Sequence, residues 1–512
     1  MHKIKLCAPE IEGQTATFRW SVDPTTSLYT RSSFQLTFPS SLDLSRVPSR
    51  LWWDILLICL HQHWLLLRPC EIQLPLELSD AEKGFWLQLL QIAADTLEST
   101  RSERRPAQTL GINFDCGSEK VPYSKIYGSG YGTAFSGGKD SLLQAALLCE
   151  LTKQPLLVTT TSPLPTLADH KTARRRQVLA AIKERRDCVF VEVVSDFRSN
   201  WDNGFCGRNG YTISVNELTD TFLYMSSLLA AGAALGRTRL FLASEVEVQE
   251  NVEIDGNIIQ HPHYMYSAAT QRALSRYLKP YGLFFGSLIW PLYSMQVQQL
   301  LWARYKDLSD LQYSCWRVEE GQATCSRCEQ CMRIAMTALA SGHNPERMGI
   351  DLGRLMSYSP EWTPIGQQSP SIPQMQVRQR AGNLVAGAIK RTGTLKLASI
   401  YLRANPRKLF SARAWHMLAA YRRLRSRVGS LPEAPDLGVR EAFLDWLDPD
   451  LRDRLISIYE TYFPFEQKHR HLKVFERSHI LTERATSALN FHVSRQSDHR
   501  GAIVEPPGAQ IT

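Results

Sequence analysis

The sequence lacks a long, uninterrupted apolar run. Its first residues, MHKIKLCAPEIEG, contain no apolar core of the kind found in signal peptides, so we expect no export. The most apolar segment, Leu51–Leu67, is interrupted by Asp54 and by the polar residues 61–63, which would be costly inside a bilayer. We therefore predict a buried helix there, and a cytoplasmic protein with no membrane partner.

Acidic residues are absent from a long stretch of the C-terminal third. Residues 363–431 contain no Asp or Glu but thirteen Lys and Arg, whereas the whole chain carries a net charge of +9. The basic region 378–427 indicates an anionic partner, either a tRNA or an acidic protein that serves as acceptor. Aromatic residues interleaved there would stack on RNA bases or simply pack in a core. They are Tyr401, Phe410, Trp415 and Tyr421.

The remaining pattern is that of an α/β protein. From about residue 130 to 305, short β-branched or apolar runs alternate with helical periods, which is typical of a parallel sheet covered by helices on both faces. We predict a doubly wound sheet of five parallel strands, which binds ligands at the carboxyl ends of its strands. The predicted parts are an N-terminal α+β domain at 1–125, a catalytic α/β domain at 126–345, a linker at 346–378, a basic helical region at 379–485 and a flexible tail at 486–512.

The segment SGGKDS, residues 136–141, separates a predicted strand from a predicted helix. Backbone amides of a glycine-rich turn at a helix start bind phosphate oxygens, although such a turn can also merely cap the helix. Lys139 supplies positive charge, and Asp140 would hold Mg²⁺ on the phosphates or fix the loop. The predicted nucleotide-binding residues are Ser136, Gly137, Gly138, Lys139, Asp140 and Ser141. The predicted catalytic residues among them are Ser136, Lys139, Asp140 and Ser141.

Four of the eleven cysteines are clustered with metal-ligand spacing. Four thiolates satisfy tetrahedral Zn²⁺ and close the site, so we expect a structural zinc, with an iron–sulfur cluster or no metal as the alternatives. The predicted ligands are Cys315, Cys325, Cys328 and Cys331. The other cysteines are expected to be small apolar core residues.

The SGGKDS segment resembles the PP-loop of the ATP pyrophosphatase superfamily, whose fold is an adenine nucleotide alpha hydrolase-like sheet with, here, a zinc-binding insert. Followed about 175 residues later by C-x9-C-x2-C-x2-C, it is similar to 7-cyano-7-deazaguanine synthases. That resemblance covers residues 130–342. It implies that a deazaguanine-type carboxylate attacks the α-phosphate of ATP, giving an acyl adenylate, pyrophosphate and finally AMP, for amide and nitrile formation. Similarity to the QueC-like proteins of anti-phage defence implies conjugation to another acceptor instead.

A second resemblance leaves the substrate open. The N-terminal region followed by GGKDS is also similar to the muramoyl-peptide glutamate epimerases, which implies adenylation of a glutamyl carboxylate. The expected cofactors are ATP, Mg²⁺ and Zn²⁺ in either case, with a small-molecule carboxylate as substrate. A tRNA-modifying PP-loop enzyme and an ATP-sensing partner protein without turnover are the alternatives. The oligomeric state stays open, a dimer being one option.

Several further residues follow predicted strands and are weaker candidates for substrate contacts. Acidic and amide side chains after the strand near 240 would bind Mg²⁺ or the amino edge of a purine, or form an acidic surface loop. His263 would act as acid or base, or be structural, and Ser267 is expected to cap a helix. Arg174–Arg176 would contact phosphate or be solvated helix charges. The weak substrate candidates are Glu245, Glu247, Asn251 and His263.

Overall fold

The computed structural model describes most of the chain up to residue 465. The described residues are 1–99, 110–163, 168–211, 213–246, 252–254, 257–259, 264–315, 318, 322–357, 389, 392–404, 407, 411–428 and 438–465. Residues Met1–Phe463 form one unit, and of the second unit, Pro464–Thr512, only the first two residues are described. Glu247, Asn251, His263, Phe410 and the predicted tail lie outside the described residues.

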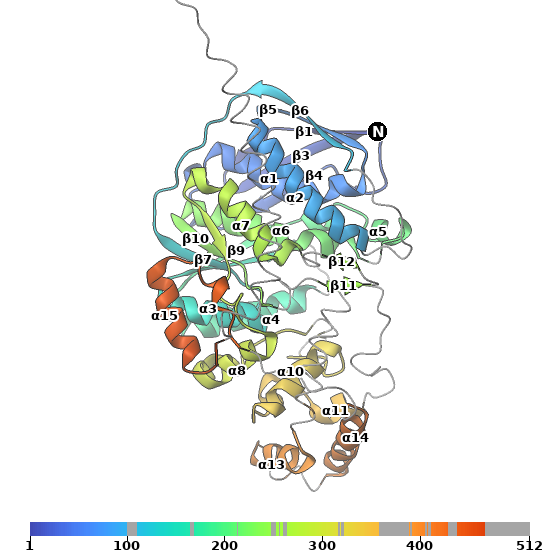
Figure 1. Cartoon of the computed structure of the whole chain (residues 1–512), viewed down its shortest axis with the longest axis vertical. Coiled ribbons are helices and arrows are strands. Elements are labelled where there is room, and N and C mark those ends of the chain that lie inside the picture. Colours follow the sequence, from blue (N-terminus) through green and yellow to red (C-terminus); the bar gives the residue numbers. More distant parts are fainter. Residues whose placement is uncertain are drawn as a thin grey trace, which may run out of the picture. The chain divides into compact units, whose positions relative to one another are not determined.

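An eleven-stranded mixed sheet, mostly parallel, organises the first unit (Figure 1). Its strands follow the order β13-β10-β7-β8-β9-β4-β3-β1-β5-β6, with β2 beside β3. The strands are β1 (His2–Leu6), β2 (Glu10–Glu12), β3 (Thr15–Asp23), β4 (Ser33–Thr37), β5 (Cys70–Leu76), β6 (Ile112–Glu119), β7 (Gly130–Ala134), β8 (Leu156–Thr161), β9 (Val189–Ser195), β10 (Arg237–Phe241) and β13 (Phe284–Gly286). A separate two-stranded sheet pairs β11 (Val252–Ile254) with β12 (Asn257–Ile259).

The α/β class predicted from the sequence is confirmed. Strands β13, β10, β7, β8 and β9 pair only in parallel with one another, in an order in which the chain moves outward from β7 in both directions. This is the doubly wound arrangement, in which a ligand crevice opens where the strand order reverses. All six residues of β8 are buried, as a central parallel strand requires.

The sheet is larger than the five strands that the sequence predicts. Strand β9 pairs antiparallel with β4 through Leu36 and Thr37, so the N-terminal strands continue the sheet of the central region across residue 125. Strands β1, β5 and β6 are parallel to one another; α2 connects β5 to β6, whereas the chain between β1 and β5 passes through β2, β3, β4 and then α1. Hydrogen bonding between strands remote in sequence creates this continuity, which no local periodicity reveals.

The helices cover the sheet in two groups. Helix α6 packs on β7, β8 and β10 and contacts α1, while α3 packs on β7 and contacts α8 and α15. The right-handed crossover rule places α3 and α6 on opposite faces. The described helices are α1 (Ser49–Leu66), α2 (Asp80–Ser99), α3 (Lys139–Leu151), α4 (Ala168–Lys183), α5 (Phe205–Arg208), α6 (Val215–Ala234), α7 (Ala268–Tyr277), α8 (Ser294–Arg304), α9 (Lys306–Ser309), α10 (Glu329–Ala340), α11 (Leu352–Ser357), α13 (Thr394–Ala404), α14 (Ala412–Val428) and α15 (Pro449–Glu460).

Helix α1 is the buried helix that the sequence predicts at Leu51–Leu67. Its residues from Arg50 to Leu65 are buried, and a search of the described helices for a membrane span finds no segment of the required length and hydropathy. Within the predicted helical region, residues 439–463 contain two separate helical segments. A 3-10 turn, Glu441–Phe443, precedes α15, which begins anew at Pro449 because proline suits the first helical turn and not the interior.

The polar residue that interrupts this apolar helix is held by hydrogen bonds. Asp54 is fully buried and accepts from the hydroxyls of Tyr277 at 2.7 Å and Tyr281 at 2.5 Å, and Arg50 Nε lies 3.7 Å from it. Burial raises the pKa of Asp54 to about 6, although Arg50 and the two tyrosines act in the opposite direction. Because the pKa of the folded protein lies above the ordinary value, this group stabilises the fold below about pH 4 and loses that contribution as pH rises through 6.

We expect Tyr281→Phe to lower the free energy of unfolding by about 1–3 kcal/mol at pH 8, because it removes a donor from a buried carboxylate. The loss should be smaller at pH 5, where Asp54 is protonated. Urea unfolding at both pH values measures it, with Tyr127→Phe, at a side chain that is 82% exposed, as the control. Equal losses at the two pH values would contradict the role assigned to Asp54.

Candidate functional site

The glycine-rich loop lies at the carboxyl end of the middle parallel strand. Strand β7 ends at Ala134, Gly138 is the N-cap of α3, and α3 begins at Lys139. The strand–loop–helix order matches the sequence prediction. Because β8 and β10 flank β7 and the chain reaches them in opposite directions, the loop stands where the strand order reverses.

The loop is held in shape by its own serines. The Ser136 N–H donates to Ser141 Oγ at 3.2 Å, the Gly138 N–H donates to Ser136 Oγ at 3.4 Å, and Ser141 Oγ donates to the Gly138 carbonyl at 3.1 Å. Gly137 has φ +84°, in the left-handed region that side chains other than glycine rarely adopt. The turn therefore requires glycine at 137 and hydroxyls at both ends.

Lys139, Asp140 and Glu245 form a cluster beside the loop. Lys139 Nζ donates to Glu245 Oε2 at 2.7 Å and also pairs with Asp140. Glu245 follows β10, so two neighbouring strands bring these charges together, as their position at one sheet edge predicts. Lys139 and Glu245 are largely buried, whereas the Asp140 side chain is 32% exposed.

The charged groups of this cluster shift one another's pKa values. Burial alone would lower the pKa of Lys139, but Asp140 and Glu245 together raise it. Burial and the charge of Glu245 raise the pKa of Asp140 well above its ordinary range. Burial would also raise the pKa of Glu245, but Lys139 and a hydrogen bond with Asp140 lower it to about 2. Burial and the charge of Glu245 therefore favour the protonated form of Asp140, whereas a divalent cation would favour its ionised form.

Of the three consecutive arginines at 174–176, Arg175 contacts the loop. Sequence patterns do not distinguish it from its two neighbours. Arg175 donates to the Ser136 carbonyl at 3.2 Å, to Thr159 Oγ1 at 3.0 Å and to the Thr160 carbonyl at 3.0 Å, and burial lowers its pKa. Arg176 instead pairs with Glu192. Arg175 thus ties the loop to the end of β8.

A buried glutamine joins the ends of three strands beneath the loop. Gln144, on α3, donates to Thr133 Oγ1 at 2.7 Å and accepts from the Leu288 N–H at 3.0 Å. Thr133 in turn donates to the Phe241 carbonyl at 3.1 Å. These bonds link the ends of β7 and β10 and the segment after β13 beneath the loop.

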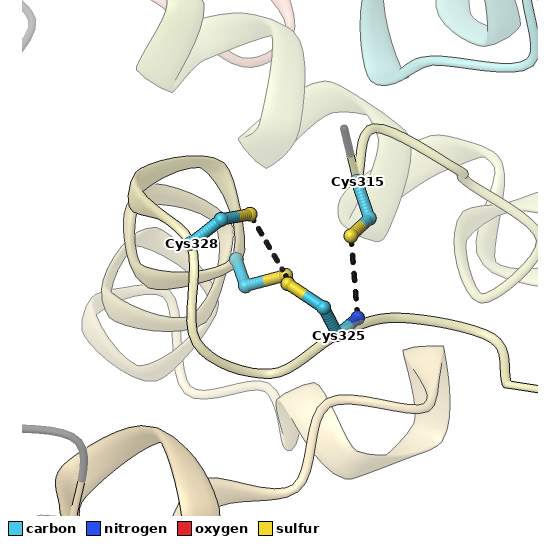
Figure 2. Close-up of side chains that lie close together, drawn as sticks. Cys315, Cys325 and Cys328 are labelled. Atoms are coloured by element: carbon cyan, nitrogen blue, oxygen red, sulfur yellow. Dashed lines mark hydrogen bonds between the residues drawn. The ribbon is translucent and has the colours of Figure 1, made fainter. Parts of the chain in front are cut away.

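The four predicted metal ligands lie together (Figure 2). All four cysteines are buried, and their sulfurs lie within 4.8 Å of one another; Figure 2 labels three of them. The Cys325–Cys331 and Cys328–Cys331 sulfur pairs are 3.9 and 3.4 Å apart. Tetrahedral zinc with Zn–S bonds of about 2.3 Å requires sulfurs about 3.8 Å apart. The donor set therefore fits a zinc ion.

Backbone geometry supports the same site. The Cys325 N–H donates to Cys315 Sγ at 3.2 Å (Figure 2), and Cys328 is the N-cap of α10, whose positive end favours thiolates. Ser326 has φ +50°, and its hydroxyl accepts from the Asp351 N–H at 2.9 Å. The turn between Cys325 and Cys328 is thus anchored from the segment that follows α10.

The cluster cannot hold four negative charges unaided. Hydrogen bonds with Cys315 and Cys331 lower the pKa of Cys328, while a hydrogen bond with Cys328 raises the pKa of Cys315 to about 12. The pKa of Cys331 is also raised, by Cys315 and Cys328. One thiolate therefore suppresses ionisation of its neighbours, and a cation is needed for all four to act as ligands.

Two residues next to this cluster reach the glycine-rich loop. The Tyr313 N–H donates to the Gly137 carbonyl at 2.6 Å, and the Lys139 N–H donates to Ser314 Oγ at 3.1 Å. Nothing in the sequence marks these residues, apart from their position just before Cys315.

The remaining described candidates are Ser267 and the aromatic residues of the basic region. Ser267 caps α7, as predicted, by accepting from the Thr270 N–H at 3.1 Å. In the basic region, Tyr401 and Tyr421 are buried, whereas Trp415 on α14 is 61% exposed. The arginines at 422, 423 and 425 on the same helix are exposed. Only Trp415, among the described aromatics of that region, is free to meet a partner.

Comparison with protein-family models, with curated proteins and with solved structures finds no match.

Metal analysis should find about one zinc per chain, and Cys328→Ser should lose most of it together with several degrees of thermal stability, because one ligand of a closed site is gone. Cys7→Ser, at an exposed cysteine, is the control and should retain both. Iron with visible absorption would assign the site to an iron–sulfur centre instead, and full zinc content in Cys328→Ser would refute the ligand set.

Proposed function

We propose that the chain is an ATP-dependent enzyme of the PP-loop type, which transfers AMP from ATP to a carboxylate and releases pyrophosphate. The observation that carries this proposal is the position of the 136–141 loop at the reversal point of the parallel sheet, with Glu245 beside it from the next strand. Crevices at that point of doubly wound sheets bind nucleotides.

In this proposal the loop binds the leaving pyrophosphate. Its amides, the N-terminus of α3 and the hydroxyls of Ser136 and Ser141 would stabilise the charge that builds up as the bond between the α and β phosphates breaks. Lys139 would turn from its carboxylate partners toward the phosphates. A substrate carboxylate oxygen would attack the α-phosphorus, giving an acyl adenylate, and an acceptor amine would then displace AMP.

The charge of the cluster supports a requirement for a divalent cation. With Asp140 and Glu245 both ionised the cluster with Lys139 carries one net negative charge, and with Asp140 protonated it carries none, so in neither state does it offer the positive charge that attracts a polyphosphate. Mg²⁺ prefers carboxylate and phosphate oxygens, and Asp140 and Glu245 offer such ligands. The magnesium would neutralise the phosphates and the leaving group.

The substrate class rests on the sequence resemblance. We propose a 7-carboxy-7-deazaguanine-like acid, and an acceptor that is a small molecule, a protein or a tRNA. The exposed Trp415 and arginines of α14 support a macromolecular acceptor, since aromatic stacking and phosphate contacts are combined on RNA-binding surfaces.

We expect wild-type protein with ATP and Mg²⁺ to form AMP, not ADP, when 7-carboxy-7-deazaguanine is added, and Asp140→Asn to form it at least about 100-fold more slowly. Nucleotide chromatography measures both products. Asp450→Asn, at a side chain that is 91% exposed, is the matched control.

Three outcomes would redirect the proposal. Wild-type rates in Asp140→Asn would refute the mechanism. AMP formed only with a glutamyl substrate would favour the epimerase-like reaction. ATP binding without AMP under any condition would favour a sensor.

A further inference from the structure

The two residues that contact the glycine-rich loop immediately precede the first ligand of the four-cysteine cluster. Cys315 is the first ligand of the cluster, and the preceding residues, Tyr313 and Ser314, are the ones that contact the loop. The two bonds run in opposite senses, because Tyr313 donates its backbone N–H to Gly137 while Ser314 accepts the backbone N–H of Lys139.

The contact is close as well as bonded. A Cβ atom at Gly138 would lie 3.4 Å from Ser314 Oγ and 3.7 Å from the Tyr313 carbonyl. The Tyr313 side chain is buried, and its Cβ lies 3.9 Å from where a Cβ of Gly137 would stand. The loop and this segment therefore cannot move independently without losing both hydrogen bonds and this packing.

We propose that Ser314 is a positioning residue that couples metal binding at the four-cysteine cluster to anion binding at the 136–141 loop. With Cys315 fixed by a metal, Ser314 holds the first amide of α3 and keeps the loop in its anion-binding shape. Without the metal, Cys315 and with it Ser314 are released. The inference rests on the proposed function, since it takes the loop to be an anion site.

Such coupling is reciprocal. If the metal strengthens anion binding by some factor, the anion must strengthen metal binding by the same factor. Inorganic pyrophosphate serves as the probe, because it needs no turnover and no knowledge of the substrate. Coupling between sites is typically fivefold or more, and loss of one hydrogen bond changes an equilibrium by a comparable factor.

The experiment measures the rate of zinc transfer from the full-length, zinc-loaded protein to a chromogenic chelator, with and without pyrophosphate and Mg²⁺. We expect pyrophosphate to slow zinc release about fivefold in the wild type and in Ser314→Thr, which keeps the hydroxyl. In Ser314→Ala, pyrophosphate should not slow zinc release. The same variant serves as the control for direct chelation of zinc by pyrophosphate.

The matched control is Ser309→Ala, because the Ser309 hydroxyl is buried but donates only locally, to the Lys306 carbonyl at 3.1 Å. It should show the wild-type slowing. Calorimetry of pyrophosphate binding to zinc-loaded and zinc-free protein gives the factor by which zinc strengthens pyrophosphate binding. Ser314→Ala should reduce that factor to one.

The outcomes separate the two proposals. Pyrophosphate that binds but leaves zinc release unchanged, or speeds it, would overturn the coupling and leave the proposed function standing. The same slowing in Ser314→Ala as in the wild type would overturn the role of Ser314. Absence of pyrophosphate binding to the zinc-loaded wild type would overturn both the anion site and the coupling.

Discussion

The candidate site depends on one sharp turn from strand to helix. Gly137 must adopt a left-handed conformation for β7 to pass directly into α3, and this places the first amides of the helix at the sheet edge. Every other element of the site approaches that turn: Arg175 from α4, Glu245 from the end of β10, and Ser314 from the segment before the cysteines. Hydrogen bonds from its own serines and from these neighbouring segments together hold the turn.

Three charged side chains, Lys139, Asp140 and Glu245, form ion pairs beside the turn. The two carboxylates Asp140 and Glu245 favour the charged form of the buried Lys139. The negative charge that the carboxylates have in excess is balanced by one proton or by one divalent cation. In the proposed function, Lys139 would exchange these carboxylate partners for a phosphate. Asp54 is the contrasting case, since it accepts from Tyr277 and Tyr281 and so joins α1 to α7 and to the turn that follows α7.

The four-cysteine cluster joins segments of the region that follows α9. It joins the segment ending at Cys315 to the start of α10, and Ser326 extends the link to the residues before α11. Because thiolates repel one another unless a cation offsets their charge, we expect a bound metal to stabilise this region. The same region contacts the glycine-rich loop through Tyr313 and Ser314, so the two features form one structural unit.

The sequence by itself determined the α/β class, the loop between strand and helix, the buried helix at Leu51–Leu67 and the set of cysteines. Each is a local pattern of a few adjacent residues or of a fixed spacing, which chemistry constrains directly. Only the tertiary structure decided that β4 pairs with β9, which joins the strands of the predicted N-terminal domain to those of the central region in one sheet. It also decided that Arg175 rather than its neighbours donates to the loop, and that Ser314 Oγ accepts from the Lys139 N–H. These contacts join residues far apart in the chain, and their energies depend on packing geometry that no local periodicity encodes.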